Sequence, residues 1–289
     1  MKQYLDLLKD IMENGIDCMD RTGAGTRSVF GRQIRFKFED GFPAVTTKKL
    51  AWKSVVSELL WFLEGSTTTH RLAEIKNDNK PYEKLTEKEK FTIWNANYEC
   101  QGKALGYTEG ELGPVYGSQW KNFNNEGVDQ VKQVIDKIRT NPNDRRLIVS
   151  AWNPAQLDKM ALPPCHMMYQ FYAKDEKLSL MWYQRSVDSA TGLPFNIASY
   201  ALLLCIVAKM TNKIPNELIG TLGDTRIYKN HFEGVQEQLK RTPHKLPTLE
   251  MPDIDWSGSI DDVLRQVKTS DFRLINYVHD DPIKYEMAV

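Results

Sequence analysis

Hydrophobic and polar positions recur first at helical and then at strand spacing in the opening forty residues. Apolar side chains return every three to four positions over residues 3–14, and Gly15 is a natural stop, so we expect a first helix there. Residues 28–30 and 33–38 alternate at every second position, which predicts two strands. The chain therefore begins with a helix followed by extended structure.

The next segments differ sharply in polarity. Residues 53–63 are nearly all apolar and predict a largely buried helix that carries one carboxylate, Glu58. Residues 74–90 are dominated by charge, and we interpret them as a solvated insertion. Residues 128–140 have apolar positions at helical spacing and predict an amphipathic helix.

Strand patterns then follow one another. Residues 147–152, 167–173 and 178–184 each predict a strand, and the short polar turn at 174–176 should join the last two as a hairpin. These strands enclose the segment with the most distinctive chemistry in the chain.

A long apolar helix is predicted over residues 196–210, in the centre of the fold. Its longest uninterrupted apolar run, residues 201–208, is too short to span a bilayer. A short strand at 219–222 and the closing tail 288–289 complete the pattern. Neither a repeat nor a flexible linker divides the sequence, so we expect one mixed α/β domain over residues 1–289.

Charge and cysteine content narrow the function classes. Lysine plus arginine and aspartate plus glutamate each number 38, so the formal net charge is zero and offers no positive field for nucleic acid or a membrane surface. The first residues lack a signal-peptide core. Widely spaced cysteines without a CxxC pair argue against a zinc site and a disulfide framework, and favour a cytoplasmic protein; they are Cys18, Cys100, Cys165 and Cys205.

Cys165 precedes a dense set of polar residues. The run Leu-Pro-Pro-Cys-His at 162–166 is followed by Tyr-Gln-Arg-Ser-Val-Asp at 183–188 and by Gly-Leu-Pro-Phe-Asn-Ile-Ala-Ser-Tyr at 192–200. A lone thiol is often an inert core residue, and the alternative is a nucleophile activated in a polar, cationic environment. The flanking prolines and histidine favour a junction between a loop and a strand, where Arg185 could supply the positive field.

Arginines in loops or at strand ends are a second signal. Several bidentate guanidinium groups with a hydroxyl suit a phosphate dianion. The adjacent pair at 145–146 is equally explained as solvated surface. The four candidates are Arg21, Arg145, Arg146 and Arg185.

Two polar groups on apolar segments have competing interpretations. Burial of Glu58 would perturb its protonation, unless it forms a salt bridge with a lysine. Asn196, at the start of the predicted central helix, is either an N-cap or an amide that reads the polar edge of a planar ring.

These motifs, from Asp-Arg-Thr-Gly at 20–23 to Glu-Met-Ala-Val at 286–289, make the chain resemble the thymidylate synthases over nearly its whole length. The resemblance implies an α+β type of α/β fold, in which a mixed twisted sheet and surrounding helices enclose a buried central helix. It also implies a homodimer that transfers a one-carbon unit from 5,10-methylenetetrahydrofolate to C5 of dUMP, without a metal. Its similarity to phage members of the family suggests a phage enzyme that acts in the cytoplasm of a bacterial host.

Carried over position by position, the resemblance implies a role for each matching residue. Cys165 would be the nucleophile on C6 of dUMP. The phosphate would be held by Arg21, Arg185 and Ser186, joined by Arg145 and Arg146 of the partner subunit. Uracil recognition and acid–base chemistry would fall to Asn196, Gln184, Glu58, Tyr116, His166 and Asp188. The deoxyribose would lie at Arg226 and Tyr228. Folate would be enclosed by Lys48, Glu58, Ile93, Trp94, Asn95, Leu162, Asp188, Thr191, Gly192, Phe195 and Val289.

Three positions depart from the family pattern. Asn95 stands where the family usually has aspartate, and Thr191 where it usually has leucine. Arg226 replaces a histidine that, with Tyr228, usually holds the 3′-hydroxyl.

Thr191 bears most directly on the product. It removes apolar packing worth about 1–2 kcal/mol and adds a hydroxyl that could hold water. We therefore expect water, rather than hydride, to quench the exocyclic methylene intermediate and give 5-hydroxymethyl-dUMP. Thymidylate synthesis is the alternative, and a non-catalytic nucleotide- or RNA-binding regulator is a remote one.

Overall fold

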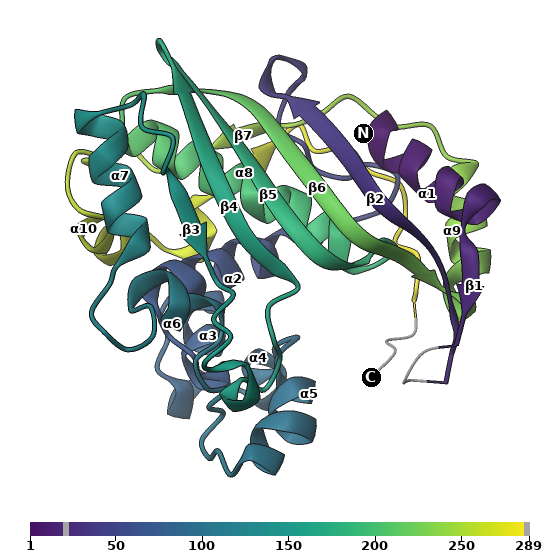
Figure 1. The fold of residues 1–289 in the computed structure, drawn as a ribbon, viewed down its shortest axis with the longest axis horizontal. Coiled ribbons are helices and arrows are strands. Elements are labelled where there is room, and N and C mark those ends of the chain that lie inside the picture. The colour runs from purple at the N-terminus through teal and green to yellow at the C-terminus, as the bar shows by residue number, and fades with distance from the viewer. Residues whose placement is uncertain (20–22, 286–289) are drawn as a thin grey trace.

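A six-stranded mixed sheet forms the centre of the molecule (Figure 1). The computed structural model describes residues 1–19 and 23–285. The strand order is β1-β2-β6-β5-β4-β3, and neighbours are antiparallel except for β5 and β6, which run parallel. The strands are β1 (Ile16–Cys18), β2 (Thr26–Lys37), β3 (Ile148–Ser150), β4 (His166–Lys174), β5 (Lys177–Asp188) and β6 (Ile214–Tyr228). A separate two-stranded sheet consists of β7 (Thr248–Glu250) and β8 (Arg273–Ile275).

Helices lie behind this sheet and along its edges. In Figure 1, α2 and α8 lie behind the strands, α1 and α9 lie at the β2 edge, and α7 lies beside β3. The helices are α1 (Lys2–Asn14), α2 (Trp52–Glu64), α3 (Thr69–Lys76), α4 (Glu87–Lys90), α5 (Asn95–Asn97), α6 (Tyr116–Lys121), α7 (Gln130–Thr140), α8 (Gly192–Met210), α9 (Phe232–Leu239) and α10 (Ile260–Gln266). The expected fold class, a mixed twisted sheet with a buried central helix, is confirmed.

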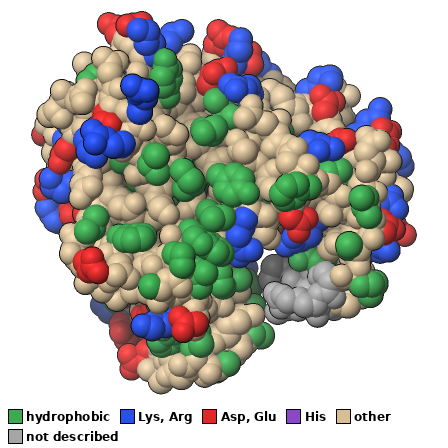
Figure 2. Space-filling view, in the orientation of Figure 1, with side chains coloured by type: hydrophobic (Ala, Val, Ile, Leu, Met, Phe, Trp, Pro, Cys, Tyr) green, Lys and Arg blue, Asp and Glu red, His purple; other side chains and the backbone are tan. Residues whose placement is uncertain are grey.

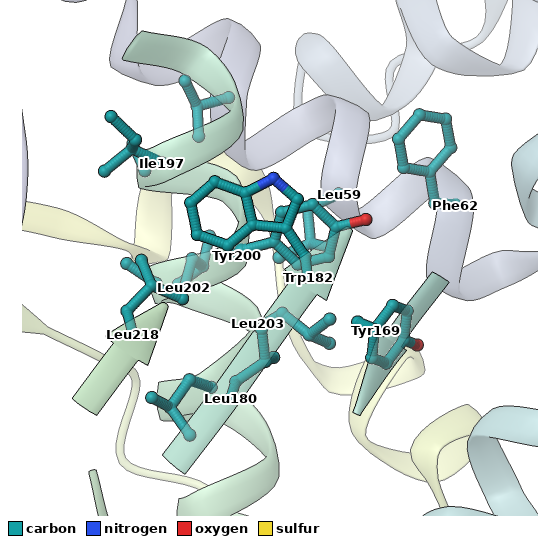
Figure 3. Close-up of a cluster of buried hydrophobic side chains, with 14 of the residues drawn as sticks. Leu59, Phe62, Tyr169, Leu180, Trp182, Ile197, Tyr200, Leu202, Leu203 and Leu218 are labelled. Atoms are coloured by element: carbon teal, nitrogen blue, oxygen red, sulfur yellow. The ribbon is translucent and has the colours of Figure 1, made fainter. Parts of the chain in front are cut away.

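Helix α8 is the buried centre of the fold (Figure 3). The Trp182 ring from β5 stacks on Tyr200 of α8, with centroids 5.3 Å apart and planes 10° from parallel. Because nearly every side of α8 packs against protein, its sequence is apolar all round instead of showing a stripe. By length and composition α8 would also suit a membrane span, but most of it lies inside the protein, as in a core helix.

The parallel pair of β5 and β6 determines where the polar motifs meet. Helix α8 connects these two strands, so both reach the same edge of the sheet with their carboxyl ends. Ser186 lies opposite Asp224 and Asp188 lies opposite Arg226 in this register. Side chains that are 38 residues apart in the sequence therefore share one face at one edge.

Several predicted boundaries differ from the structure for physical reasons. The two short strands expected at 28–30 and 33–38 are one strand, β2, which passes through Gly31 with a φ of 72°. β6 extends beyond the expected 219–222 at both ends: its first residues pair with the start of β5, and its polar last residues, from Asp224, reach the site and lack an apolar pattern. The central helix begins at Gly192, not at residue 196.

The charged segment 74–90 has local structure of its own. It contains the end of α3, a short 3-10 turn and α4, whose N-cap Thr86 forms a capping box with Glu89. Lys80 forms an ion pair with Glu89 at 3.1 Å. Local capping and ion pairs thus order a segment that has little apolar surface to bury.

Candidate active site

Cys165 lies at the junction between a loop and β4, as its sequence context predicts. Its backbone N–H donates to the Tyr116 hydroxyl at 2.7 Å, and its carbonyl accepts from the Arg185 N–H at 2.8 Å. The residue is half-buried. Contacts from α6 and β5 therefore fix the backbone that carries the thiol.

Arg185 reinforces this position through its side chain. Its Nε donates to the Pro164 carbonyl at 2.9 Å and its Nη2 to the Pro163 carbonyl at 3.1 Å. The guanidinium carbon lies 5.3 Å from the centre of the Trp152 ring. The arginine expected near the thiol thus holds the preceding loop and brings a positive charge to it.

His166 is a neutral, firmly held ring. It is stacked on Tyr116 with centroids 4.2 Å apart, and its Nδ1 lies 2.7 Å from the Tyr200 hydroxyl. Burial lowers the pKa of His166 to about 3, so the imidazole carries no charge near neutral pH. Burial also raises the pKa of Tyr116 and Tyr200 well above the ordinary tyrosine value, which leaves both as hydroxyl groups.

Glu58 is a buried carboxyl on α2. The Trp94 indole donates to Glu58 Oε1 at 2.7 Å. Burial raises the pKa of Glu58 to about 7, against the smaller lowering effect of the indole hydrogen bond. The alternative of a lysine salt bridge is wrong, and the group can gain or lose a proton near neutral pH.

Gln184 and Asn196 form an amide pair. Gln184 Nε2 donates to Asn196 Oδ1 at 3.0 Å and to the Ser186 carbonyl at 3.1 Å, while its Oε1 accepts from the Trp182 indole at 3.1 Å. Because α8 begins at Gly192, Asn196 lies within the helix, and the N-cap alternative is wrong. The Asn196 amide N–H₂ and a second lone pair on its oxygen remain to meet a polar ring edge.

Asp188 is held by the turn that leads into α8. Its Oδ1 accepts from the backbone N–H groups of Ala190 and Thr191, both at 3.1 Å, and its Oδ2 accepts from the Thr191 hydroxyl. Nearby, Lys48 Nζ donates to the Ala190 carbonyl and lies 4.6 Å from the centre of the Tyr285 ring. Burial lowers the pKa of Lys48 to about 8, although the Asp188 charge opposes this shift.

Arg226 also lies at the carboxyl ends of β5 and β6. Its Nη2 donates to Ser186 Oγ and its Nη1 to Asp224 Oδ2, each at 2.6 Å. Its guanidinium carbon lies 6.0 Å from the centre of the Tyr228 ring. Ser186 and Tyr228, predicted to bind phosphate and deoxyribose, therefore share one arginine.

The remaining expected positions differ in their surroundings. Trp94 is buried, whereas Ile93 is 43% exposed. Asn95 Oδ1 accepts from both the backbone and the hydroxyl of Thr92 at 2.6 Å, so its carbonyl stabilises a local turn. Leu162 and Phe195 are half-buried against the core, and Gly192 starts α8. Arg21 and Val289 lie outside the described residues.

Within the described residues, one chain does not bring Arg145 and Arg146 to the Cys165 end of β4. Both are exposed, and Arg146 pairs with Asp144 of its own loop at 3.1 Å. Ile148 lies opposite Gln170 in the antiparallel β3–β4 ladder. Continuing this register two residues back places Arg146 beside the end of β4 that is farther from Cys165. About seven residues of strand, or roughly 20 Å, separate the two.

Two residues at the site were not anticipated from the sequence. Tyr200 bonds His166, and its position four residues after Asn196 in α8 places both on one helical face. That spacing was a usable signal. Trp152, beneath Arg185, comes from a different segment and had none.

Comparison with known proteins agrees with this arrangement. The family model for thymidylate synthase matches residues 2–289. The chain belongs to the thymidylate synthase family. A thymidylate synthase of Enterobacteria phage T4 is 53% identical over 295 residues, covering all of both chains. Another, from Aster yellows witches'-broom phytoplasma (strain AYWB), is 49% identical over 298 residues, again covering all of both. The crystal structure of the T4 phage thymidylate synthase covers all of both chains at 52% identity, with a TM-score of 0.91.

Family membership establishes the type of reaction. The chain is a thymidylate synthase-family enzyme that acts on dUMP, with methylenetetrahydrofolate as co-substrate. The remote alternative, a non-catalytic regulator, is wrong. Among residues 1–19 and 23–285, no group of three or more histidine, cysteine, aspartate or glutamate side chains is placed to hold a metal ion.

Proposed function

We propose that this enzyme makes dTMP and dihydrofolate from dUMP and 5,10-methylenetetrahydrofolate. The observation that carries this choice of product is the Thr191 hydroxyl, which donates to Asp188. The hydroxymethylase prediction relied on that hydroxyl to hold a water, but its one hydrogen is committed to Asp188, so it cannot donate to a water there. The relatives from phage T4 and the phytoplasma are both named thymidylate synthases, which supports hydride transfer as the final step.

Cys165 is the proposed nucleophile. Its thiolate adds to C6 of dUMP, and the electron pair moves to C5, which attacks the one-carbon unit of the co-substrate. Loss of the C5 proton and elimination of tetrahydrofolate give an exocyclic methylene, which then accepts hydride from tetrahydrofolate. The thiolate leaves C6 as dTMP forms. The restrained Cys165 backbone supports this role, because a fixed nucleophile needs less reorganisation to reach C6.

Three groups around the thiol would manage protons. Glu58, with a pKa of about 7, can both donate and accept a proton through ordered water near O4 and C5 of uracil. Tyr116 and neutral His166 would act as hydrogen-bonding groups that orient this water. Since only Glu58 titrates near neutral pH among these three, we assign the proton shuttle to it.

The amide pair would select the pyrimidine. Asn196 can accept from N3–H and donate to O4 of uracil, and Gln184 fixes the direction of its amide. A cytosine ring reverses these requirements and would leave buried polar groups without partners, at a cost of about 1–3 kcal/mol.

Folate would lie along the turn into α8. Asp188 would bind the pterin, near Lys48 and the apolar surfaces of Trp94, Leu162 and Phe195. Ile93, Asn95, Thr191, Gly192 and Val289 complete the proposed set. The half-exposed state of Ile93 and Phe195 supports this, because both retain surface that a flat ring system could cover.

The phosphate site requires two chains. We assign Arg185, Ser186 and Arg21 to one subunit and Arg145 and Arg146 to its partner in a homodimer. The separation of roughly 20 Å between Arg146 and Cys165 along β4 supports this assignment, because one chain alone cannot bring them together.

The front face of the sheet is the proposed dimer surface. Ile148 and Met181 both lie opposite Gln170, so all three are on one face, and Tyr172 follows on the same side of β4. Tyr172 is 65% exposed. Figure 2 shows hydrophobic side chains gathered on this face, which is typical of an interface.

Two coarser features complete the proposal. The whole chain would be one catalytic domain, with residues 74–90 as a solvated insertion on it. All four cysteines are free thiols, which is compatible with action in the reducing cytoplasm of a bacterial host.

Product analysis tests the proposed function. Purified protein is incubated with dUMP and 5,10-methylenetetrahydrofolate while dihydrofolate is followed by ultraviolet absorbance and the nucleotide by mass spectrometry. We expect dTMP and dihydrofolate in equal amounts. A nucleotide with one oxygen more than dTMP, formed without dihydrofolate, would establish the hydroxymethylase instead.

A further inference from the structure

The Arg226 side chain, near the end of β6, forms hydrogen bonds with its own strand and with the adjacent strand β5. It bridges Ser186 of β5 and Asp224 of β6, at 2.6 Å each. Its side chain is only 21% exposed, against 49% for Asp224. The guanidinium is therefore held in one direction by a carboxylate, and its second arm is aimed at a hydroxyl.

This geometry determines how Ser186 can bond. A serine hydroxyl has one hydrogen to donate and an oxygen that accepts. Arg226 Nη2 supplies a donor to Ser186 Oγ, so the hydroxyl hydrogen must point to some other acceptor. Arginine cannot lose its proton under ordinary conditions, so this constraint holds at every working pH.

We propose that Arg226 is a positioning residue for the phosphate of dUMP. By occupying the acceptor side of Ser186, it makes the hydroxyl a committed donor to a phosphate oxygen, and its charge favours the dianion. The hydrogen bond to Asp224 fixes the orientation of the guanidinium. The inference rests on the proposed function, because it takes Ser186 as a phosphate ligand.

The planar fork of arginine is essential to this role. One guanidinium spans Asp224 and Ser186 with two different nitrogens. A lysine ammonium provides a compact charge without that fixed fork. Lysine should therefore preserve the charge but only part of the positioning.

Binding of dUMP and of deoxyuridine, which lacks the phosphate, provides the test. Both are titrated calorimetrically into the full-length enzyme, the Arg226→Ala, Arg226→Lys and Ser186→Ala variants, and the Arg226→Ala/Ser186→Ala double variant. Arg273→Ala is the matched control, because Arg273 forms an exposed ion pair with Glu250 in the separate β7–β8 sheet. KM for dUMP and kcat are measured in parallel.

Arg226→Ala should weaken dUMP binding about ten-fold and raise its KM similarly, with kcat and deoxyuridine affinity changed less than about two-fold. Arg226→Lys should fall between wild type and Arg226→Ala. The double variant should lose clearly less than the product of the two single losses, because the Ser186 donor is lost only once and just the charge of Arg226 adds to it.

Other results would overturn the inference in distinguishable ways. An equal loss for deoxyuridine would show that Arg226 binds the sugar or base, and additive losses of about a hundred-fold in the double variant would show that it acts independently of Ser186. If Ser186→Ala leaves dUMP binding unchanged, the phosphate assignment fails as well. Failure of the wild-type enzyme to turn over dUMP would refute the proposed function itself.

Discussion

The Thr191 hydroxyl donates to Oδ2 of Asp188, while the Thr191 backbone N–H donates to Oδ1 of the same carboxylate. One residue thus contacts both oxygens of the group proposed to bind the pterin. A leucine at this position could supply only the backbone contact. The threonine that suggested a water site in the sequence is, in the structure, a support for Asp188.

Replacing Thr191 by valine should therefore affect folate more than chemistry. Valine keeps the shape but removes the hydroxyl, so we expect KM for methylenetetrahydrofolate to rise about five-fold through loss of one charge-assisted hydrogen bond. kcat should change less, and dTMP should remain the product. Steady-state kinetics with product mass spectrometry measure both. An unchanged KM would mean that Asp188 does not depend on this hydroxyl.

Cys165→Ala should abolish turnover but keep dUMP binding, because the phosphate and uracil contacts do not involve the thiol. Release of the C5 proton from dUMP, followed with a tritium label, should also disappear. Cys100→Ala is the matched control, since that thiol is exposed, and it should retain wild-type turnover. Continued proton release by Cys165→Ala would show that another residue is the nucleophile.

Glu58 should make folding stability depend on pH. Its folded-state pKa is about 7, raised from 4.5 by burial. Between these values the folded protein holds a proton that the unfolded chain has released, so stability falls as pH rises through this window, by about 3 kcal/mol in total. Glu58→Gln cannot ionise and should escape this loss.

Thermal denaturation of Glu58→Gln and wild type at pH 5, 6, 7 and 8 measures the effect. The melting temperature of the variant relative to wild type should rise between pH 5 and 7 and level off by pH 8, and the variant should have a lower kcat because the proton shuttle is lost. Glu13→Gln, on an exposed part of α1, should show a small difference without this trend. A flat difference for Glu58→Gln would mean that the carboxyl does not titrate in this range.

Shared sites predict complementation between inactive variants. When Cys165→Ala and Arg146→Ala subunits exchange freely, half of the dimers are hybrids and each hybrid has one intact site, so about a quarter of wild-type activity should return. Two Cys165→Ala preparations mixed in the same way should stay inactive. If native mass spectrometry shows hybrids and activity does not return, the arginines act within their own chain or not at all.

Asn196→Asp should shift the preference from dUMP toward dCMP. A protonated aspartate can donate its O–H to N3 of cytosine and accept from the 4-amino group, whereas the Asn196 amide, in the direction fixed by Gln184, accepts at N3 and donates at position 4. The ratio of kcat/KM for the two nucleotides should change by at least about ten-fold, in line with one mispaired buried group. If the ratio of kcat/KM for dUMP to that for dCMP is the same in wild type and variant, Asn196 does not recognise the base.

Local patterns in the sequence determined most of the elements. Helices α1 and α2 and the β4–β5 hairpin follow their predictions closely, because each shows a clear apolar period bounded by a glycine or a polar turn. The motif around Cys165 was equally readable, since its neighbours in sequence are also its neighbours in space. The resemblance of these motifs to the thymidylate synthases also predicted the type of reaction.

Only the tertiary structure decided what each polar side chain contacts. The pairing of Arg226 with Ser186 depends on the parallel register of β5 and β6, and the pKa of Glu58 depends on burial beside Trp94, which lies 36 residues away. Hydrogen-bond partners and desolvation arise from segments that meet only when the chain folds. For that reason the sequence by itself determined which chemical groups the site contains, and the fold determined their protonation, direction and partners.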